Sequence, residues 1–487
     1  MNHRISTYIA TFFLLGAACP GGAQVSSEVQ STARQLAGSV YAGRSMETLR
    51  ELSDTFGGRL SGSPAYNRGV EWAIAQLRSY GIQNVTTEPF TIPNGWQRGP
   101  AHGEIISPMS RPLHIESLGW APATPSGGVQ GTVVLIDDVS ATAIKAKAGE
   151  IKGNIVLLNF DKILEQGEMK AFDELIASAQ LLKDAGALAV LNPSRNKNNA
   201  ISAFSLDWKA RESPLPEAEL GMEDAQLIRR ELSGGPVVIH FELNNRTTGP
   251  IQINNVIAEI RGSEKPDEWI LLGAHFDSWD FGTGAEDNGT GSIAVMEVAR
   301  AIAALGKPPK RSIRFALWGG EEQGLLGSFT YVQAHLHEIN KCVAVLNTDN
   351  GPGHPKGWKV EGRKDVKAAL QPISDSVLKD LGGGDISMEF TYDTDHGPFA
   401  LQGVPALDQW VDSGAYDEIH HKSGDTYDKV DPVDFKAGVA VLAATAWVIA
   451  NDEKPIAPHI DHAAVADILK KQEGLVEMLT TAGQWKP

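Results

Sequence analysis

Cysteine is nearly absent from this chain, which contains two cysteines, Cys19 and Cys342, among 487 residues. A disulfide framework is excluded, because Cys19 lies in an N-terminal leader and Cys342 lies in an apolar run that predicts a buried small side chain. The fold must therefore depend on its hydrophobic core and on any metal that it binds.

Positive charge is also scarce, since 43 Lys and Arg face 60 Asp and Glu, for a net charge of −17. This balance argues against nucleic acid or an anionic membrane surface as the main partner. Internal repeats and low-complexity tracts are absent as well. A hydrophobic content of 42% with 21% charged residues is typical of a globular chain, here two domains and a leader.

Long hydrophobic runs are lacking too. The apolar stretch Tyr8–Ala18 follows a short basic start and is too short to span a bilayer with ease. Together with the small residues 21–23, it predicts a secretory signal peptide over residues 1–23. A lipoprotein site at Cys19 is the alternative, although the residues before it match that pattern poorly. We expect no second membrane span, and a mature protein that is secreted or periplasmic.

Two common catalytic motifs are missing. The chain has no His-Glu-x-x-His and no Gly-x-Ser-x-Gly nucleophile elbow. The segment 289–294 matches a relaxed dinucleotide fingerprint, but it follows an acidic loop and not a strand, so a nucleotide cofactor is not expected.

Two changes of pattern divide the chain. Residues 24–94 and 248–487 predict one discontinuous domain, and residues 95–247 predict a β-rich insert with one clear helix, Leu175–Ala185. After the insert, buried strands alternate with helices, which predicts an α/β fold with a mostly parallel mixed sheet flanked by helices. The strands expected there are Trp269–Ala274, Ile313–Leu317 and Val343–Leu346, and the helices are Gly291–Ala304, Gly324–His337, Asp365–Leu381 and a last amphipathic helix, Asp461–Thr481.

Polar side chains follow these strands directly. His275, the pair Glu321-Glu322 and Asp349 each come just past a strand end, where α/β folds bind ligands, and Asp287 and His421 lie in loops. Two histidines with three or four carboxylates suit a pair of divalent ions such as zinc. They also suit metal-assisted hydrolysis.

Each of these residues has a structural alternative when taken alone. A histidine at a strand end is often a satisfied core residue, an aspartate often makes a turn, and a glutamate pair favours the start of a helix. Asp277, two residues after His275, favours a ligand role, because a metal-bound histidine usually donates its other ring nitrogen to a carboxylate. The joint occurrence at several strand ends favours one site.

Five motifs together resemble the M28 family of co-catalytic zinc exopeptidases, and the resemblance covers nearly all of the mature chain. The tandem His420-His421 and the insert are most similar to the carboxypeptidase Q branch. The motifs are His275-Phe276-Asp277-Ser278, Asp287–Gly291, Trp318–Ser328, Asn347-Thr348-Asp349 and His421–Thr426.

The resemblance implies a zinc-exopeptidase fold of the phosphorylase/hydrolase-like kind, an insert like a protease-associated (PA) domain, and two Zn²⁺ ions per chain. His420 stands where a tyrosine often precedes the ligand histidine, so it is a candidate oxyanion stabiliser, as is a residue near 395–398. We expect the neighbouring His420 and His421 to point in different directions. The implied roles are Asp287 as the bridge between the ions, His275 and Asp349 on one ion, Glu322 and His421 on the other, Glu321 as general base, and Asp277 orienting His275.

The expected function is a secreted di-zinc exopeptidase whose substrates are dipeptides or short peptides with a free terminus. Its activity is that of a carboxypeptidase, a dipeptidase or an aminopeptidase, and a homodimer is left open. The alternatives are a glutaminyl-cyclase-like transferase and a non-catalytic binding ectodomain on a peptidase scaffold. The complete ligand set favours hydrolysis.

Overall fold

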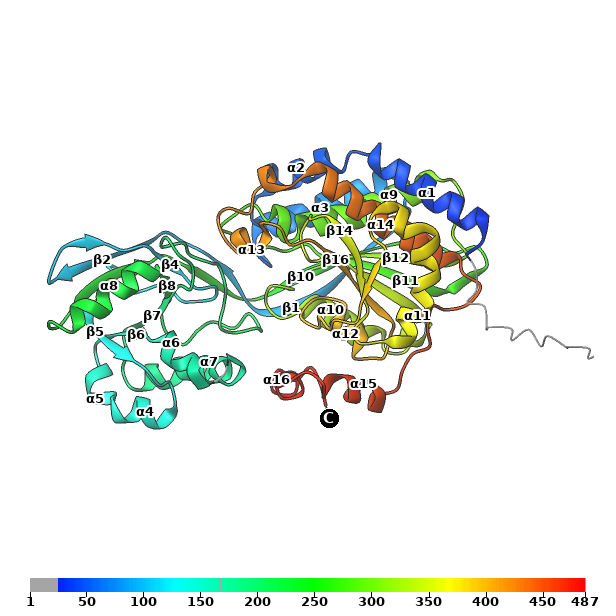
Figure 1. Ribbon diagram of the computed structural model, residues 1–487. Helices are drawn as coiled ribbons and strands as arrows, with labels where there is room; N and C mark the ends of the chain where they lie inside the picture. Colours follow the sequence, from blue (N-terminus) through cyan, green and yellow to red (C-terminus); the bar gives the residue numbers. More distant parts are fainter. Residues whose placement is uncertain (1–24, 167, 487) are drawn as a thin grey trace, which may run out of the picture.

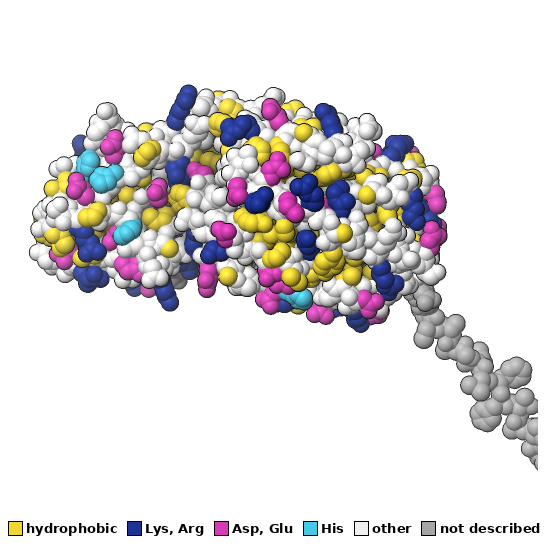
Figure 2. Space-filling model, turned by 90° about the horizontal axis from the view of Figure 1, so that it is seen from above, with side chains coloured by type: hydrophobic (Ala, Val, Ile, Leu, Met, Phe, Trp, Pro, Cys, Tyr) yellow, Lys and Arg dark blue, Asp and Glu magenta, His cyan; other side chains and the backbone are white. Residues whose placement is uncertain are grey.

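The computed structural model describes residues 25–166 and 168–486, and Figure 1 shows two lobes, each built around one sheet. The expected signal peptide and Cys19 lie outside the described residues. Seen from above, Lys, Arg, Asp and Glu side chains are interspersed over the face drawn in Figure 2. No single-sign patch gathers on that face.

The larger lobe is built on an eight-stranded sheet. Its strands are β1 (Asn84–Gln97), β10 (Arg246–Ile260), β11 (Lys265–His275), β12 (Arg311–Trp318), β13 (Cys342–Asn347), β14 (Pro355–Lys359), β15 (Asp385–Ser387) and β16 (Ala406–Val411). The order is β1-β10-β12-β11-β13-β16-β14-β15. The central strands β12, β11, β13 and β16 are parallel, and β1, β10 and β14 pair antiparallel. The predicted fold class and the three predicted strands are confirmed.

Helices cover both faces of this sheet (Figure 1). The helices of this lobe are α1 (Ser27–Tyr41), α2 (Ser45–Phe56), α3 (Pro64–Ser79), α9 (Gly291–Ala304), α10 (Leu326–His335), α11 (Lys364–Ile373), α12 (Gly397–Ala400), α13 (Tyr416–Ile419), α14 (Pro432–Asn451), α15 (His462–Leu469) and α16 (Leu475–Thr481). Along β11, Ile270 and Leu272 pack in the core with α1, α9 and α14, whereas Leu271 packs with α10 and α12. Burial on both faces explains why the central strands are continuously apolar.

Helix α14 corrects the expectation that no second stretch could span a membrane. By length and composition this 20-residue helix is long and apolar enough, but 83% of its most apolar window is buried inside the protein. It packs against α1 and α9. A helix that is apolar all round is a core helix here, because other elements surround it.

The smaller lobe holds a second eight-stranded sheet, in the order β3-β2-β9-β5-β6-β7-β8-β4. Its strands are β2 (Ala101–Ser107), β3 (Arg111–Pro112), β4 (Ile115–Ser117), β5 (Val129–Ile136), β6 (Ile155–Leu158), β7 (Ala189–Pro193), β8 (Glu217–Leu220) and β9 (Val238–Leu243). Strands β5 to β8 are parallel. All strands of this sheet lie within the segment expected to be an insert.

The expectation of one clear helix in this segment is wrong. Its helices are α4 (Ala141–Ala146), α5 (Ala148–Ile151), α6 (Phe160–Ile163), α7 (Glu168–Asp184) and α8 (Met222–Leu232). In α8 only Asp224, Ala225 and Ile228 are buried, so its apolar stripe is too narrow to stand out among charged residues.

The C-terminal segment also departs from its prediction. The single helix expected over 461–481 is two helices, α15 and α16, separated before Gly474. Gly474 has φ of 75°, a left-handed conformation that glycine adopts without steric cost. The break turns α16 back onto a small apolar cluster that includes Tyr392 and Trp485.

Candidate metal centre

The carboxyl ends of β12, β11 and β13 meet at one edge of the larger sheet, because these three strands are adjacent and parallel. His275 is the last residue of β11, the Glu321-Glu322 pair follows β12, and Asp349 follows β13. Asp287 lies in the irregular turn Ala285–Thr290 that leads into α9. The topology thus brings together residues that are far apart in the sequence.

The first ligand group consists of His275, Asp287 and Asp349. His275 Nε2 lies 3.2 Å from Asp287 Oδ1 and 3.0 Å from Asp349 Oδ1. His275 is 1% exposed. Because histidine nitrogen and carboxylate oxygen converge in a buried place, the group can hold a divalent ion such as zinc.

The second group shares Asp287 through its other oxygen. His421 Nε2 lies 3.3 Å from Asp287 Oδ2 and 2.9 Å from Glu322 Oε2. The other oxygen of Glu322, Oε1, is buried and has no hydrogen-bond partner. An unpartnered buried carboxylate oxygen beside two other donors fits a cation, because burying it without a partner is costly.

The neighbouring histidines do not point in different directions, so that expectation is wrong. His420 Nε2 also lies near Asp287 Oδ2, at 3.4 Å, and the two rings stack with centroids 3.8 Å apart. His421 has φ of 58°, and this left-handed conformation turns its side chain to the same side as that of His420. Of the two histidines, only His421 has a recorded contact with Glu322.

Asp277 orients His275 in a different way from the one expected. The ring N–H at His275 Nδ1 donates to the backbone oxygen of Asp277 at 3.0 Å, whereas the Asp277 carboxylate is 3.8 Å away. That carboxylate instead accepts from the backbone N–H of Glu321 at 3.2 Å and of Glu322 at 3.4 Å. Asp277 therefore holds both His275 and the turn that carries Glu321 and Glu322, here called the glutamate turn.

Buried charges shift the pKa values at this centre. Burial lowers the pKa of His275, but Asp349 and Glu321 outweigh it and hold this pKa well above its ordinary value. Burial also lowers the pKa of His421, but Glu322 and Asp287 outweigh it and raise this pKa to about 10. Without metal, His275 and His421 therefore keep their protons, and a bound cation would displace these protons.

Glu321 is the remaining acid at the centre. Its Oε2 lies 3.9 Å from His275 Nε2, and its side chain is 12% exposed. Burial raises the pKa of Glu321 well above its ordinary value, and the nearby Asp349 adds to the rise. With His420 it lines a cleft of about 1040 Å³. A carboxylate at the base of a cleft with a raised pKa suits proton transfer.

Three further residues support the metal centre. The sequence alone assigned no role to any of them. Asp425 accepts from the backbone N–H of Glu286 at 2.7 Å and of Asp287 at 3.2 Å, which fixes the shared ligand. Arg59 and Ser61 reach the same region from the N-terminal part of the chain. Asp425 lies in the motif His421–Thr426, so the sequence offered a signal for it. No neighbouring sequence pattern indicates a role for Arg59 or Ser61.

Known proteins share this arrangement of fold and sequence. Residues 255–446 match Peptidase family M28. Carboxypeptidase Q of Mus musculus is 31% identical over 427 residues, which cover 84% of this chain and 86% of that protein. The chain belongs to peptidase family M28. This is a family of zinc exopeptidases, so the chain is a metallopeptidase.

Solved structures agree with this membership. A peptidase M28 precursor from Shewanella amazonensis superposes with a TM-score of 0.76 at 30% identity, covering 89% of this chain and 99% of that one. A zinc aminopeptidase from Bacillus subtilis superposes with a TM-score of 0.64 at 21% identity, covering 87% and 97%. The second likeness, at 21% identity, shows the shared fold alone.

Proposed function

We propose that this M28 member is a secreted or periplasmic di-zinc exopeptidase that hydrolyses dipeptides or short peptides with a free terminus. The observation that supports it best is the position of Asp287. One of its oxygens faces His275 and the other faces His421. A carboxylate shared in this way suits two ions held side by side, with His275 and Asp349 on one ion and Glu322 and His421 on the other.

The proposed chemistry divides between the ions and the chain. When bound, the two zinc ions supply Lewis-acid chemistry that lowers the pKa of water and polarises a carbonyl. Glu321 accepts the proton of the attacking water and later delivers it to the leaving amine. Burial lowers the pKa of His420 to about 4, so its ring is neutral and one N–H can donate to the carbonyl oxygen as negative charge develops there.

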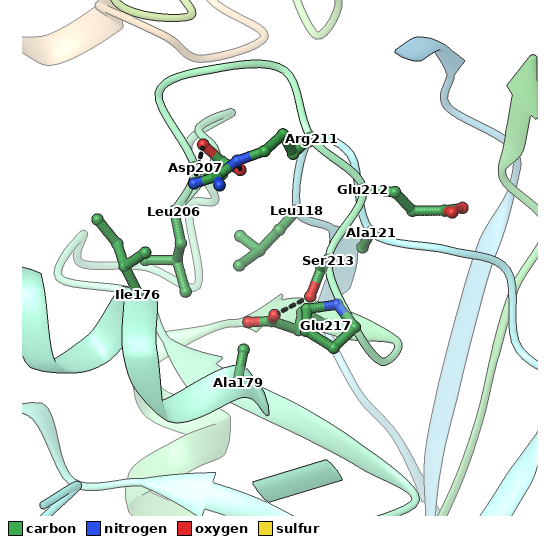
Figure 3. A pocket seen from close by; sticks show the side chains of 12 residues that line it. Leu118, Ala121, Ile176, Ala179, Leu206, Asp207, Arg211, Glu212, Ser213 and Glu217 are labelled. Atoms are coloured by element: carbon green, nitrogen blue, oxygen red, sulfur yellow. Dashed lines mark hydrogen bonds and ion pairs between the residues drawn. The ribbon is translucent and has the colours of Figure 1, made fainter. Parts of the chain in front are cut away.

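The cleft supports a short substrate, because the smaller lobe and the C-terminal segment both contribute walls beside the metal centre. Phe204 and Trp208 come from the smaller lobe, and Leu475 and Met478 come from the C-terminal segment. Leu206, on the same loop as Phe204 and Trp208, points instead into a separate cavity of about 240 Å³ in the smaller lobe (Figure 3). Phe204, Trp208, Leu475 and Met478 thus give the cleft apolar and aromatic patches among polar lining residues such as Lys359, Glu389 and Gln472.

The location outside the cytoplasm is proposed from the N-terminal sequence, which has a short basic start, an apolar stretch and small residues before position 24. Expression of the full chain in a bacterial host tests it. The protein recovered outside the cytoplasm should begin at Gln24, and recovery of an uncleaved cytoplasmic chain would contradict this part of the proposal.

The enzymatic proposal is tested with residues 24–487 loaded with zinc. We expect two zinc ions per chain and release of amino acids from a library of dipeptides and tripeptides. Matched peptides blocked by acetylation or amidation identify the terminus, because blocking the recognised end should abolish hydrolysis. Cleavage that survives blocking of both ends would overturn the exopeptidase assignment. Ammonia release from glutaminyl peptides without peptide-bond cleavage would support the transferase alternative instead.

A further inference from the structure

The loop between α2 and α3, residues 57–63, lies outside the 255–446 family match and has no part in the proposed chemistry. Yet it contains the most deeply buried arginine near the metal centre. Arg59 is 0% exposed and Ser61 is 0% exposed. Burying a guanidinium is costly unless its donors are satisfied and its charge is compensated, so the position of Arg59 needs a reason.

The guanidinium of Arg59 forms hydrogen bonds with the segment 276–284, which runs from the end of β11 to the turn that holds Asp287. Its Nε donates to the carbonyl of Phe276 at 2.8 Å, at the start of the segment. Its two terminal nitrogens donate to the carbonyls of Thr283 and Gly284, each at 2.9 Å, at the end of the segment. One rigid planar group thus fixes both ends of the segment.

Two further hydrogen bonds connect the backbone of Arg59 with Ser278, which lies in the same segment 276–284. The backbone N–H of Arg59 donates to Ser278 Oγ at 2.9 Å, and the N–H of Ser278 donates to the Arg59 carbonyl at 3.3 Å. Gly284 must be glycine for this approach, because a Cβ there would lie 2.2 Å from Ser278 Oγ and 3.1 Å from an Arg59 nitrogen. The close approach of the two segments therefore explains the glycine at position 284.

The charge of Arg59 is compensated at longer range. All recorded hydrogen-bond acceptors of its side chain are carbonyl oxygens, and no carboxylate is among them. Burial lowers the pKa of Arg59 to about 10, and the acids Asp425 and Asp277 oppose this fall. The side chain is therefore charged at neutral pH and offsets the negative charge that gathers at the metal centre.

Ser61 connects the same loop to the glutamate turn, which carries Glu321 and Glu322. Its hydroxyl donates to Asp277 Oδ2 at 2.8 Å and accepts from the backbone N–H of Gly320 at 3.0 Å. Asp277 in turn holds the backbone N–H groups of Glu321 and Glu322. One hydroxyl therefore links the carboxylate behind His275 to the turn that carries both glutamates.

We propose that Arg59 and Ser61 are positioning residues of the metal centre, with Arg59 fixing the segment between His275 and Asp287 and Ser61 fixing the glutamate turn. The inference rests on the proposed function only for the identity of the ions. It assigns a role to the N-terminal part of the chain, more than two hundred residues before the ligands that it supports.

The first experiment measures zinc binding to the metal-free protein by calorimetry with a competing chelator. Arg59→Met removes every side-chain donor and the charge, whereas Arg59→Lys keeps an ammonium donor and the charge but not the planar fork. We expect a loss of zinc affinity of about 10–100-fold for Arg59→Met, the usual effect of changing groups that support metal ligands, and a smaller loss for Arg59→Lys. Affinities equal to that of the unaltered protein would overturn the role of Arg59.

The second experiment uses a matched pair on the same loop and does not depend on the Arg59 variants folding. Ser61→Ala removes the link to Asp277. Ser63→Ala is the control, because Ser63 only caps α3 through the backbone N–H of Tyr66 at 3.1 Å. We expect Ser61→Ala to lower zinc affinity and to lower kcat about tenfold with KM little changed, as for an interaction made in the transition state. Ser63→Ala should lower only the melting temperature.

The outcomes separate the two proposals. If the unaltered protein binds no zinc, the proposed function and this inference both fail. If it binds two ions and Ser61→Ala behaves like Ser63→Ala in affinity and kcat, only the positioning role of Ser61 fails. Because calorimetry needs no substrate, the affinity result stands whatever peptides the enzyme cleaves.

Discussion

Carboxylates are buried in two regions of this molecule, and the protein treats them differently. At the edge of the larger sheet, Asp287 and Glu322 face histidine nitrogens. In the smaller lobe, Glu217 and Glu219 of β8 are 3% and 4% exposed. Their recorded partners are neutral: the Ser213 hydroxyl donates to Glu217, and the backbone N–H of Ser202 donates to Glu219.

This difference shows how the surroundings of a buried acid decide its use. Burial raises the pKa of both Glu217 and Glu219 to about 7, so near neutrality each is partly protonated. The pKa of Asp287 shifts in the opposite direction. Burial would raise this pKa, but hydrogen bonds from His275 and His421 hold the pKa well below its ordinary value. The difference lies in the number of histidine partners, because burial raises the pKa of Glu322, which contacts His421 alone, to about 7. Asp287, held between His275 and His421, stays ionised and can bind a cation, whereas Glu217 and Glu219, among hydroxyls and amides, take up a proton near neutrality.

Asp287→Ala should give the largest effect, because it removes the acid shared by both ligand groups. We expect zinc content to fall below two ions per chain, with activity lost. The stabilisation by bound zinc, about 4 kcal/mol at a zinc concentration 1,000 times Kd, should be lost with it. Metal analysis and thermal melting with and without zinc measure both. Two retained ions with an unshifted melting temperature would show that Asp287 is not the bridge.

Glu321→Gln separates proton transfer from metal binding at the same edge. The amide keeps the shape of the side chain but cannot accept the water proton, so turnover should fall by at least ~10²-fold with zinc content unchanged. Steady-state kinetics and metal analysis on the same sample check it. Near-normal turnover would remove Glu321 from the role of general base.

The histidine pair gives a finer test, because both rings face Asp287 but only His421 contacts Glu322. We expect His421→Ala to lower zinc content. His420→Ala should keep both ions and slow catalysis roughly 10²-fold, the usual effect of losing one oxyanion donor. If His420→Ala empties a site and His421→Ala does not, the two roles must be exchanged.

Trp208→Ala tests whether the smaller lobe takes part in substrate selection. Trp208 lines the cleft, and Leu206 on the same loop lines the other cavity. We expect Trp208→Ala to change the ratio of kcat/KM between bulky apolar and glycine-containing dipeptides about tenfold, the scale of a few lost apolar contacts. Leu206→Ala is the control and should leave this ratio unchanged. Equal ratios in both variants would exclude Trp208 from selectivity.

Glu217→Gln should give the smallest effect, and the size of this effect on stability depends on pH. The pKa of Glu217 rises from 4.5 to about 7 on folding, so the folded state binds the proton more tightly and stability is lost as pH rises through this range. Glutamine cannot ionise, so the variant should melt about 2–4 °C higher at pH 8 and show no gain at pH 4. Exposed Glu212→Gln is the control. A gain at pH 4 as large as at pH 8 would contradict the ionisation.

Much of the fold near the ligands could be predicted, because its signals are local. The apolar runs of β11, β12 and β13 predicted buried parallel strands, and the acids and histidines just past them pointed to one edge. Helix α8 was missed since its apolar stripe is narrow, and α14 was missed as a long apolar helix because no amphipathic period marks it. The break at Gly474 depends on one glycine inside a helical pattern.

The sequence by itself determined which residue types can bind metal and move protons, because these follow from side-chain chemistry and from positions beside strand ends. Only the tertiary structure decided how they face one another. The left-handed backbone of His421 turned two neighbouring rings the same way, and the carbonyl of Asp277 took the place expected for its carboxylate. Arg59 reached the segment 276–284 through contacts with residues more than two hundred positions away, which no local pattern can record.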